Sequence, residues 1–258
     1  RVMRLAINGY GRVGRCLLRA WHEREDTQSL SMVAINELAS HDAIAYLTQY
    51  DSTHGRFPAD VSCAVNHGGS YADNATEQQL LIDEAGINEI AIDLLQQADQ
   101  SQLPWQALDI DLVMECTGKI TTAVEAKKHI DSGAKQVLLS NPGEALIPAL
   151  VYGVNHHSIN TEQSILSAAS CTSNALVPVL SVLDNAFGVE NGVVTTIHAS
   201  MHDQPVIDAY HSQDLRRNRA ASQSIIPVDT ALAQGIDRVL PHLQGKFVAH
   251  ALRVPVNN

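Results

Sequence analysis

Short hydrophobic runs alternate with amphipathic segments along the first 140 residues of the chain. The predicted strands lie at 2–8, 32–36, 110–118 and 136–140, and the predicted helices at about 12–23, at 41–50 and in a segment ending near 132. Such alternation is typical of an α/β doubly wound parallel sheet, whose ligands bind at the carboxyl ends of the strands. Short strands near 61–65, 79–82 and 88–92 are also predicted, in a region with no recognisable chemistry.

The second half of the chain has a different pattern. A strand from residue 165 gives way to a helix at Ser170, and there follow a strand at 192–199, a long polar segment at 201–227, a helix at 228–239 and a strand at 246–255. We predict two domains, 1–170 and 171–258, the second of them α+β. The last strand has no obvious partner, so this second domain is expected to be incomplete at its C-terminus.

Composition narrows the classes of function. The net charge of −11 is spread along the 258 residues without a basic stripe, so nucleic acid is not an expected partner. No apolar run is long enough to predict a membrane segment. The four cysteines lie far apart and lack metal-ligand spacing, which favours reduced thiols in a cytoplasmic protein and no metal site.

A glycine-rich turn follows the first predicted strand. Gly9, Gly11 and Gly14 match GxGxxG between a strand and a helix, the context that dinucleotide binding requires. Glu37 follows the second strand, where its carboxylate can accept hydrogen bonds from a ribose diol and would repel a 2′-phosphate. We therefore predict a Rossmann-type domain that binds NAD rather than NADP. The alternatives are an ordinary turn and a solvated carboxylate.

Two polar residues follow later strands of the predicted sheet. Thr117 and Ser140 stand at carboxyl ends, where they could face the cofactor crevice or act as ordinary helix caps.

Cys171 lies where a predicted strand turns into a helix. Backbone N–H groups and the helix dipole at such a turn favour the thiolate and can hold an oxyanion. A buried, inert thiol is the alternative, since cysteine is often a small core residue. His198 ends the strand at 192–199 and could serve as the base for this thiol, or be structural.

The polar segment at 201–227 carries the main local positive charge. Arg216 and Arg217 could attract a phosphorylated substrate, or form a solvated or subunit-contacting surface.

Several motifs occur in one order along nearly the whole chain. They are Ile7-Asn-Gly-Tyr-Gly-Arg-Val-Gly-Arg15, Tyr50-Asp-Ser-Thr-His-Gly-Arg56, Glu115-Cys-Thr-Gly118, Gly153-Val-Asn-His156, Ser170-Cys-Thr-Ser-Asn174, Thr195-Thr-Ile-His198 and Arg253-Val-Pro255. In combination they resemble the glyceraldehyde-3-phosphate dehydrogenase superfamily. The resemblance implies that Cys171 is the nucleophile and His198 its base, in a homotetramer that binds NAD.

The resemblance also implies the remaining site residues. Those expected to bind the cofactor are Asn8, Gly9, Gly11, Arg12, Val13, Gly14, Glu37, Thr117, Gly118 and Ser140. Those expected to bind a phosphorylated aldose are Ser170, Thr172, Arg216, Arg217, Thr230 and Arg253.

Within the family, the chain is more similar to the branch that oxidises D-erythrose 4-phosphate to 4-phosphoerythronate, a precursor of pyridoxal phosphate. Glu37 stands where the glycolytic branch usually has Asp, and Met201 where it usually has a phosphate-binding threonine. Ala231 replaces the glycine that usually follows Thr230. A thioether cannot donate a hydrogen bond to phosphate. This fits a different mode of substrate binding, and water as the second nucleophile.

Two alternatives stay open. One is a phosphorylating glyceraldehyde-3-phosphate dehydrogenase, and the other is a non-catalytic NAD-binding fragment. The family continues beyond the last strand seen here with further strands and a helix, so a truncated chain is expected.

Overall fold

The computed structural model describes residues 1–65, 78–86, 89–160, 162–210 and 212–256. The chain divides into two compact units, which are described separately. The N-terminal unit comprises Arg1–Leu150 and Ile159–Ala169, and the C-terminal unit comprises Val151–Ser158 and Ser170–Asn258. The stretch at 151–158 therefore groups with the second unit, although the predicted division runs at residue 170.

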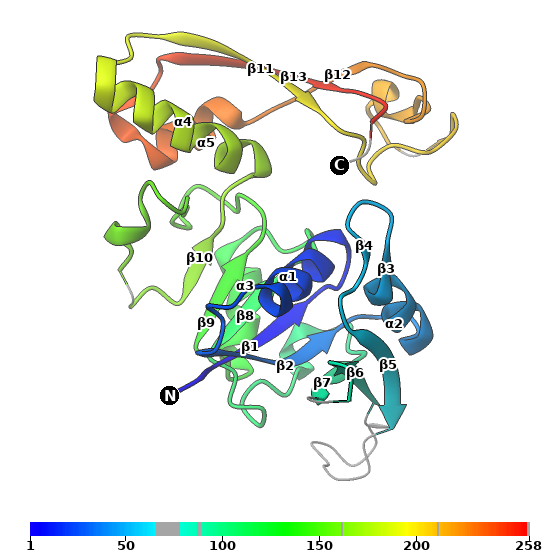
Figure 1. Cartoon of the computed structure of the whole chain (residues 1–258). Coiled ribbons are helices and arrows are strands. Elements are labelled where there is room, and N and C mark those ends of the chain that lie inside the picture. Colours follow the sequence, from blue (N-terminus) through cyan, green and yellow to red (C-terminus); the bar gives the residue numbers. More distant parts are fainter. Residues whose placement is uncertain (66–77, 87–88, 161, 211, 257–258) are drawn as a thin grey trace. The chain divides into compact units, whose positions relative to one another are not determined.

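An eight-stranded sheet forms the centre of the N-terminal unit (Figure 1). In spatial order its strands are β10 (Ile165–Ser167), β9 (Gln136–Leu139), β8 (Leu112–Glu115), β1 (Met3–Asn8), β2 (Leu30–Asn36), β7 (Glu89–Leu95), β6 (Gln78–Asp83) and β5 (Asp60–Val65). The strands from β10 to β7 pair in parallel, whereas β6 and β5 add antiparallel pairs. The predicted doubly wound α/β sheet is confirmed. Because β2 and β8 lie on opposite sides of β1, the switch point of the sheet falls at β1.

Hydrophobic clusters on the two faces of the sheet form the core of this unit. One contains Ile7 from β1 together with Leu18 of α1 (Arg12–Glu23) and Ile44 of α2 (His41–Gln49). The other contains Val113 of β8 and Ala126 of α3 (Ala123–Asp131). Within β1, Ile7 belongs to the first cluster and its neighbour Ala6 to the second, because successive side chains of a β-strand point to opposite faces of the sheet. The short strands β3 (Tyr50–Asp51) and β4 (Gly55–Arg56) form a separate hairpin.

Local capping defines where the helices begin. Ser40 caps α2, and Thr122 forms a capping box with Glu125 at the start of α3. Ser170 caps the long helix α4 (Cys171–Phe187) by accepting a hydrogen bond from the N–H of Ser173, 3.0 Å away.

A three-stranded sheet organises the C-terminal unit. Its order is β11 (Gly192–His198), β13 (Phe247–Arg253) and β12 (Ile226–Val228), with β13 parallel to β11 and antiparallel to β12. Helix α5 (Leu232–Val239) contacts both α4 and β13. The helices cover one face of this sheet, because alternate residues of β11 and β13 are shielded while those between them are exposed.

Two predictions for this unit are wrong. The strand at the end of the chain is not unpartnered, because β13 pairs on both sides. The predicted helix at 228–239 begins only at Leu232, since Ile226 to Val228 form an edge strand instead. Pro227 is tolerated there because an edge strand does not require every backbone N–H.

Candidate active site

A pocket of about 290 Å³ opens at the carboxyl ends of the strands of the N-terminal unit. The predicted cofactor residues that line it are Asn8, Gly9, Gly11, Glu37 and Thr117. They follow or end β1, β2 and β8, which is where a doubly wound sheet places its ligand.

The glycines of the turn fit a dinucleotide. Gly9 has a φ of +88°, and a Cβ there would lie 2.6 Å from the backbone N of Thr117, so only glycine lets the two loops approach. A Cβ at Gly11 would meet no atom within 4 Å, although Gly11 lines the pocket. The backbone is therefore open to a pyrophosphate at the N-terminus of α1.

Glu37 is held at the edge of the pocket by the glycine-rich turn. Its Oε2 accepts a hydrogen bond from the N–H of Tyr10 at 2.8 Å, and its Oε1 accepts one from the N–H of Leu38 at 2.7 Å. Both oxygens of the carboxylate are thereby fixed in place beside the pocket, and the ribose contact stays a prediction.

Other predicted cofactor residues do not line the pocket. Arg12 is paired with Asp51 of β3, Val13 is largely exposed, and Gly14 packs beneath Gly9. Ser140 forms a hydrogen bond with the thiol of Cys116, a half-buried residue. Burial of this thiol raises its pKa to about 12 despite that bond, so it stays protonated.

The pocket also contains residues that the sequence did not predict. They are Asn36, Leu38, Gln97, Ala98, Gln100, Cys116 and Lys119. Gln97 and its neighbours follow β7, in a region where the sequence shows no recognisable chemistry. Recognising β7 as a parallel strand of the main sheet would have placed its carboxyl end beside the site.

Cys171 and His198 meet within the C-terminal unit. The Sγ of Cys171 lies 3.4 Å from the Nε2 of His198, although the residues are 27 positions apart. Cys171 is exposed and is the first residue of α4, so its sulfur lies at the positive end of the helix dipole.

A backbone carbonyl sets the tautomer of His198. Nδ1 lies 2.8 Å from the oxygen of Ala199, which can only accept, so Nδ1 carries the proton. Nε2 is consequently the atom that can take a proton from the thiol. This is the arrangement of a nucleophile with its general base.

Strand pairing brings Arg253 next to this pair. Because β11 and β13 are parallel and His198 is in register with Arg253, both side chains project from the same face of the sheet. That is the face on which α5 packs, and Arg253 is only 6% exposed there.

An aspartate joins Arg253 to one of the loop arginines. Asp203 accepts hydrogen bonds from Nη1 of Arg253 at 2.6 Å and from Nη1 of Arg217 at 3.1 Å. The Nε atoms of both arginines are buried without a hydrogen-bond partner among the described residues. Nε of Arg217 also lies 3.6 Å from a carboxylate oxygen of Asp214, so the two guanidinium groups face two carboxylates, and it is Arg253 that brings a positive charge beside His198.

The remaining predicted substrate residues fall in two groups. Ser170 and Thr172 are hydrogen-bonded to each other at 3.0 Å beside Cys171. Arg216 and Thr230 instead line a separate hollow together with Thr195, and neither Cys171 nor His198 lines it. Thr195 is an odd number of positions from His198 on β11, so the two face opposite sides of the sheet.

These features define an NAD-binding dehydrogenase: a doubly wound sheet with a glycine-lined pocket, in one chain with an α+β unit that carries a cysteine–histidine pair. Residues 3–123 match the NAD binding domain of glyceraldehyde 3-phosphate dehydrogenase, and residues 170–258 match the C-terminal domain of the same enzyme. Together the two matches cover most of the chain, and the chain belongs to the glyceraldehyde-3-phosphate dehydrogenase superfamily. The predicted family and the predicted cofactor, NAD, are confirmed. Among the residues that the structure places, no helix is both long and apolar enough to cross a membrane.

Proposed function

We propose that the protein oxidises the aldehyde of D-erythrose 4-phosphate to 4-phosphoerythronate with NAD, with Cys171 as nucleophile. The observation that carries the chemistry is the 3.4 Å contact between Cys171 Sγ and His198 Nε2, with the histidine tautomer set by Ala199. The product is a precursor for pyridoxal phosphate synthesis in the branch of the family that the chain resembles.

The chemistry begins with the sulfur. His198 Nε2 takes the thiol proton, and the thiolate adds to the aldehyde carbon, so that an S–C bond forms and the carbonyl oxygen gains negative charge. The N–H of Cys171 in the first turn of α4 and the protonated Nε2 stabilise this oxygen. His198 passes its proton to this oxygen to form the thiohemiacetal hydroxyl, and it takes that proton back as the carbon is oxidised to a thioester.

When bound, NAD supplies the hydride acceptor for this oxidation. The residues that would hold it are those of the glycine-lined pocket, with Glu37 on the ribose. Once His198 has released its proton to solvent, its Nε2 takes a proton from water; the resulting hydroxide attacks the thioester carbon, and the C–S bond breaks to release the acid and regenerate the thiolate.

The arginine cluster supports a phosphorylated substrate. Arg253 and Arg217 lie on either side of Asp203, and the strand register places Arg253 beside His198. Met201 lies two residues before Asp203 and is half-exposed, and its thioether offers phosphate no donor. This departure from the glycolytic pattern, with Glu37 and Ala231, supports erythrose 4-phosphate and water over the triose and inorganic phosphate.

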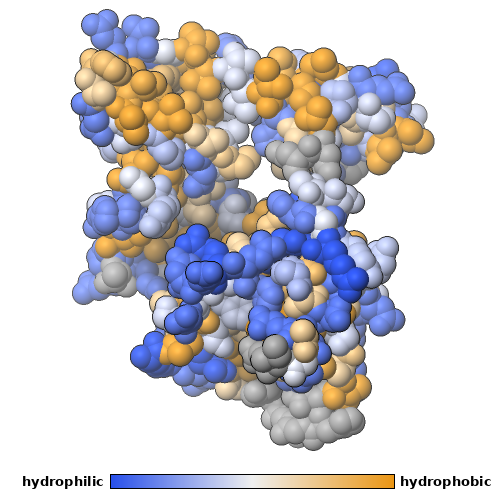
Figure 2. Space-filling view, in the orientation of Figure 1, coloured by the Kyte–Doolittle hydropathy of each residue, from blue (hydrophilic) through white to orange (hydrophobic). Residues whose placement is uncertain are grey.

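An exposed apolar sheet face supports assembly into a homotetramer. Val193 and Ile197 of β11 and Val248 of β13 are each more than half exposed on the face away from the helices. Hydrophobic side chains are prominent on the visible surface of the C-terminal unit in Figure 2. An exposed sheet face on which several apolar side chains lie among Thr195 and His250 fits burial in a subunit interface.

The test is NADH formation by the purified protein with erythrose 4-phosphate in phosphate-free buffer, compared with glyceraldehyde 3-phosphate plus inorganic phosphate. Faster turnover of the erythrose sugar without phosphate supports the proposal. A preference for the triose with an absolute need for phosphate would assign the chain to the glycolytic branch. No turnover of either substrate by protein that binds NAD would indicate a non-catalytic NAD-binding chain.

A further inference from the structure

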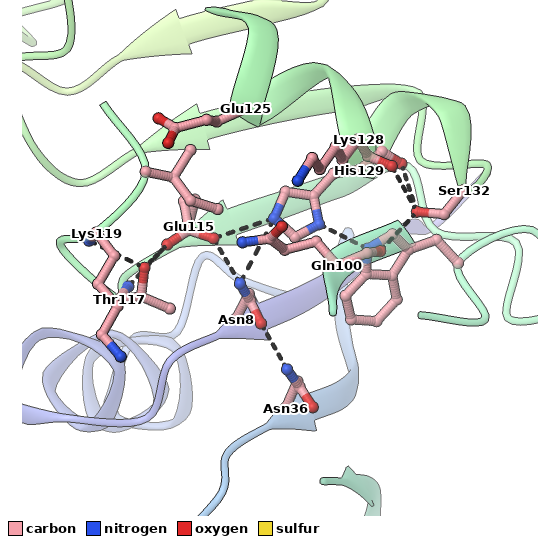
Figure 3. A network of polar contacts seen from close by, with 12 residues as sticks. Asn8, Asn36, Gln100, Glu115, Thr117, Lys119, Glu125, Lys128, His129 and Ser132 are labelled. Atoms are coloured by element: carbon pink, nitrogen blue, oxygen red, sulfur yellow. Dashed lines mark hydrogen bonds and ion pairs between the residues drawn. The ribbon is translucent and has the colours of Figure 1, made fainter. Parts of the chain in front are cut away.

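A buried carboxylate lies beneath the NAD pocket and takes no part in the chemistry described above. Glu115, the last residue of β8, is completely buried, and every partner of its two oxygens is a donor (Figure 3). Oε1 accepts from the N–H of Thr117 at 2.8 Å and from the hydroxyl of the same residue. Oε2 accepts from Nδ2 of Asn8 at 2.5 Å and from Nε2 of His129 at 3.0 Å.

The direction of the histidine bond follows from a tryptophan. Nε1–H of Trp105 can only donate, and it lies 2.9 Å from Nδ1 of His129. Nδ1 must therefore accept, which leaves the proton on Nε2, facing Glu115. Both aromatic side chains are fully buried, so no water competes for these positions.

Glu115 is held as an anion. Burial by itself raises the pKa of this carboxyl, but the hydrogen bonds from His129, Thr117 and Asn8 outweigh burial and lower the pKa below its usual value. A charged acceptor binds neutral donors about twice as strongly as a neutral acceptor does, so the donors around it are firmly placed.

The same contacts continue to the wall of the pocket. Asn8 and Thr117 line the pocket directly. Oδ1 of Asn8 accepts from Nδ2 of Asn36 at 2.7 Å, and Oδ1 of Asn36 accepts from the N–H of Gln97 at 2.8 Å. One chain of hydrogen bonds therefore joins the carboxyl ends of β8, β1, β2 and β7, each of which contributes to the pocket.

We propose that Glu115 is a positioning residue for NAD: with His129 behind it, its carboxylate holds Thr117 and Asn8 at the distance that leaves the pocket open beside Gly9. The loops that carry Gly9 and Thr117 are close together, as shown by the collision that a single Cβ on Gly9 would make with Thr117. A shift of either loop would therefore change the shape of the pocket at the glycine-rich turn. The proposal rests on NAD binding by this domain and is independent of the identity of the aldehyde.

The decisive variant is Glu115→Gln, which keeps the shape of the side chain. All partners of the Glu115 carboxylate are donors. In the variant, the NH₂ group of the glutamine side chain must replace one of the two oxygens, so either Asn8 and His129 or Thr117 lose their acceptor. We expect the dissociation constant for NAD, measured by calorimetry, to rise at least ten-fold. Turnover at saturating NAD and the KM for the aldehyde should change less than three-fold, because Cys171 and His198 are untouched.

The matched control is Glu25→Gln, the same chemical change at an exposed turn position. It should bind NAD as the parent protein does. A folded Glu115→Gln protein with the affinity of this control, or one with unchanged affinity but reduced turnover, would overturn the proposal.

A second pair of variants decides the matter should Glu115→Gln fail to fold. Glutamine at position 129 can present a donor near the place of Nε2, whereas leucine cannot. We expect His129→Leu to weaken NAD binding several-fold and His129→Gln to restore most of the affinity, in proteins whose helical content by circular dichroism matches the parent. Equal affinities for NAD in these two variants would contradict a positioning role for the Glu115–His129 pair.

Discussion

Arg253 provides the sharpest test of how the C-terminal unit recognises its substrate. The guanidinium is nearly buried, is placed beside His198 by the strand register, and shares Asp203 with Arg217. Arg253→Met keeps much of the length of the side chain and removes the charge. The remaining Arg217 is paired with both Asp203 and Asp214, so the position in register with His198 is left without a positive charge.

The size of the effect follows from the lost contacts. A charge-assisted hydrogen bond contributes about 1.5–3 kcal/mol, and a guanidinium can make two such bonds to a phosphate. Arg253 already forms hydrogen bonds with Asp203 in the free protein. Weakening these bonds when the phosphate binds offsets part of the binding energy. We expect a net loss of about 2–4 kcal/mol, or about 30- to 1,000-fold in kcat/KM for a phosphorylated aldehyde.

The assay compares a phosphorylated aldehyde with an unphosphorylated aldehyde of the same chain length. For the unphosphorylated compound, the change in kcat/KM should be less than about three-fold, since Cys171 and His198 remain in place. Arg219→Met is the control, because Arg219 lies in the same loop as Arg217, is exposed and pairs with Asp208 instead of Asp203. An equal fall in kcat/KM for both aldehydes would refute a phosphate-binding role for Arg253.

Three further predictions address the nucleophile, the cofactor preference and acid stability. Cys171→Ala should abolish aldehyde oxidation and leave the NAD dissociation constant within about two-fold of the parent; residual turnover would exclude the cysteine as nucleophile. Glu37→Ser should raise the ratio of NADP to NAD in kcat/KM at least ten-fold, because it removes the charge that would repel a 2′-phosphate, and an unchanged ratio would contradict the ribose contact. Although burial opposes ionisation of Asp51, the N–H groups of His54 and Thr53 and the Arg12 guanidinium lower its pKa to about 2. Its stabilising effect is therefore complete above about pH 4 and lost as the pH falls towards 2, so Asp51→Asn should cost about 1–2 kcal/mol of unfolding free energy at pH 7 and almost none near pH 2. Denaturant titrations at both pH values measure this, and an equal cost at both would refute it.

Features that depend on neighbouring residues could be predicted from the sequence. The strand, glycine turn and helix at the N-terminus need only local contacts, and the structure has β1 ending at Asn8 and α1 beginning at Arg12. The same holds for Ser170, whose side chain caps α4 three residues away and so places Cys171 in the first turn. Hydrophobic periodicity also predicted most strands of the main sheet, because each strand buries alternate or successive residues in the clusters on the two faces of the sheet.

Features that depend on pairing between distant segments could not be predicted. The edge strand at Ile226–Val228 was not predicted, because its pairing with β13 cannot be seen in three residues. Gln97 was missed because its place in the pocket depends on β7 lying beside β2. Arg216 and Arg217 are adjacent residues of the same type, which the sequence cannot tell apart. In the structure, Arg217 forms a hydrogen bond with Asp203, whereas Arg216 forms its hydrogen bonds with Asp214.

By itself the sequence determined the local chemistry of this protein: a dinucleotide-type turn, a cysteine at a helix start, and an order of motifs that identifies the family. The tertiary structure alone decided which side chains meet. The register of β11 with β13 places Arg253 beside His198, and the packing of α3 on the main sheet buries His129 against Glu115. These contacts span tens of residues, and they form only when whole strands and helices pack against one another, which no local pattern records.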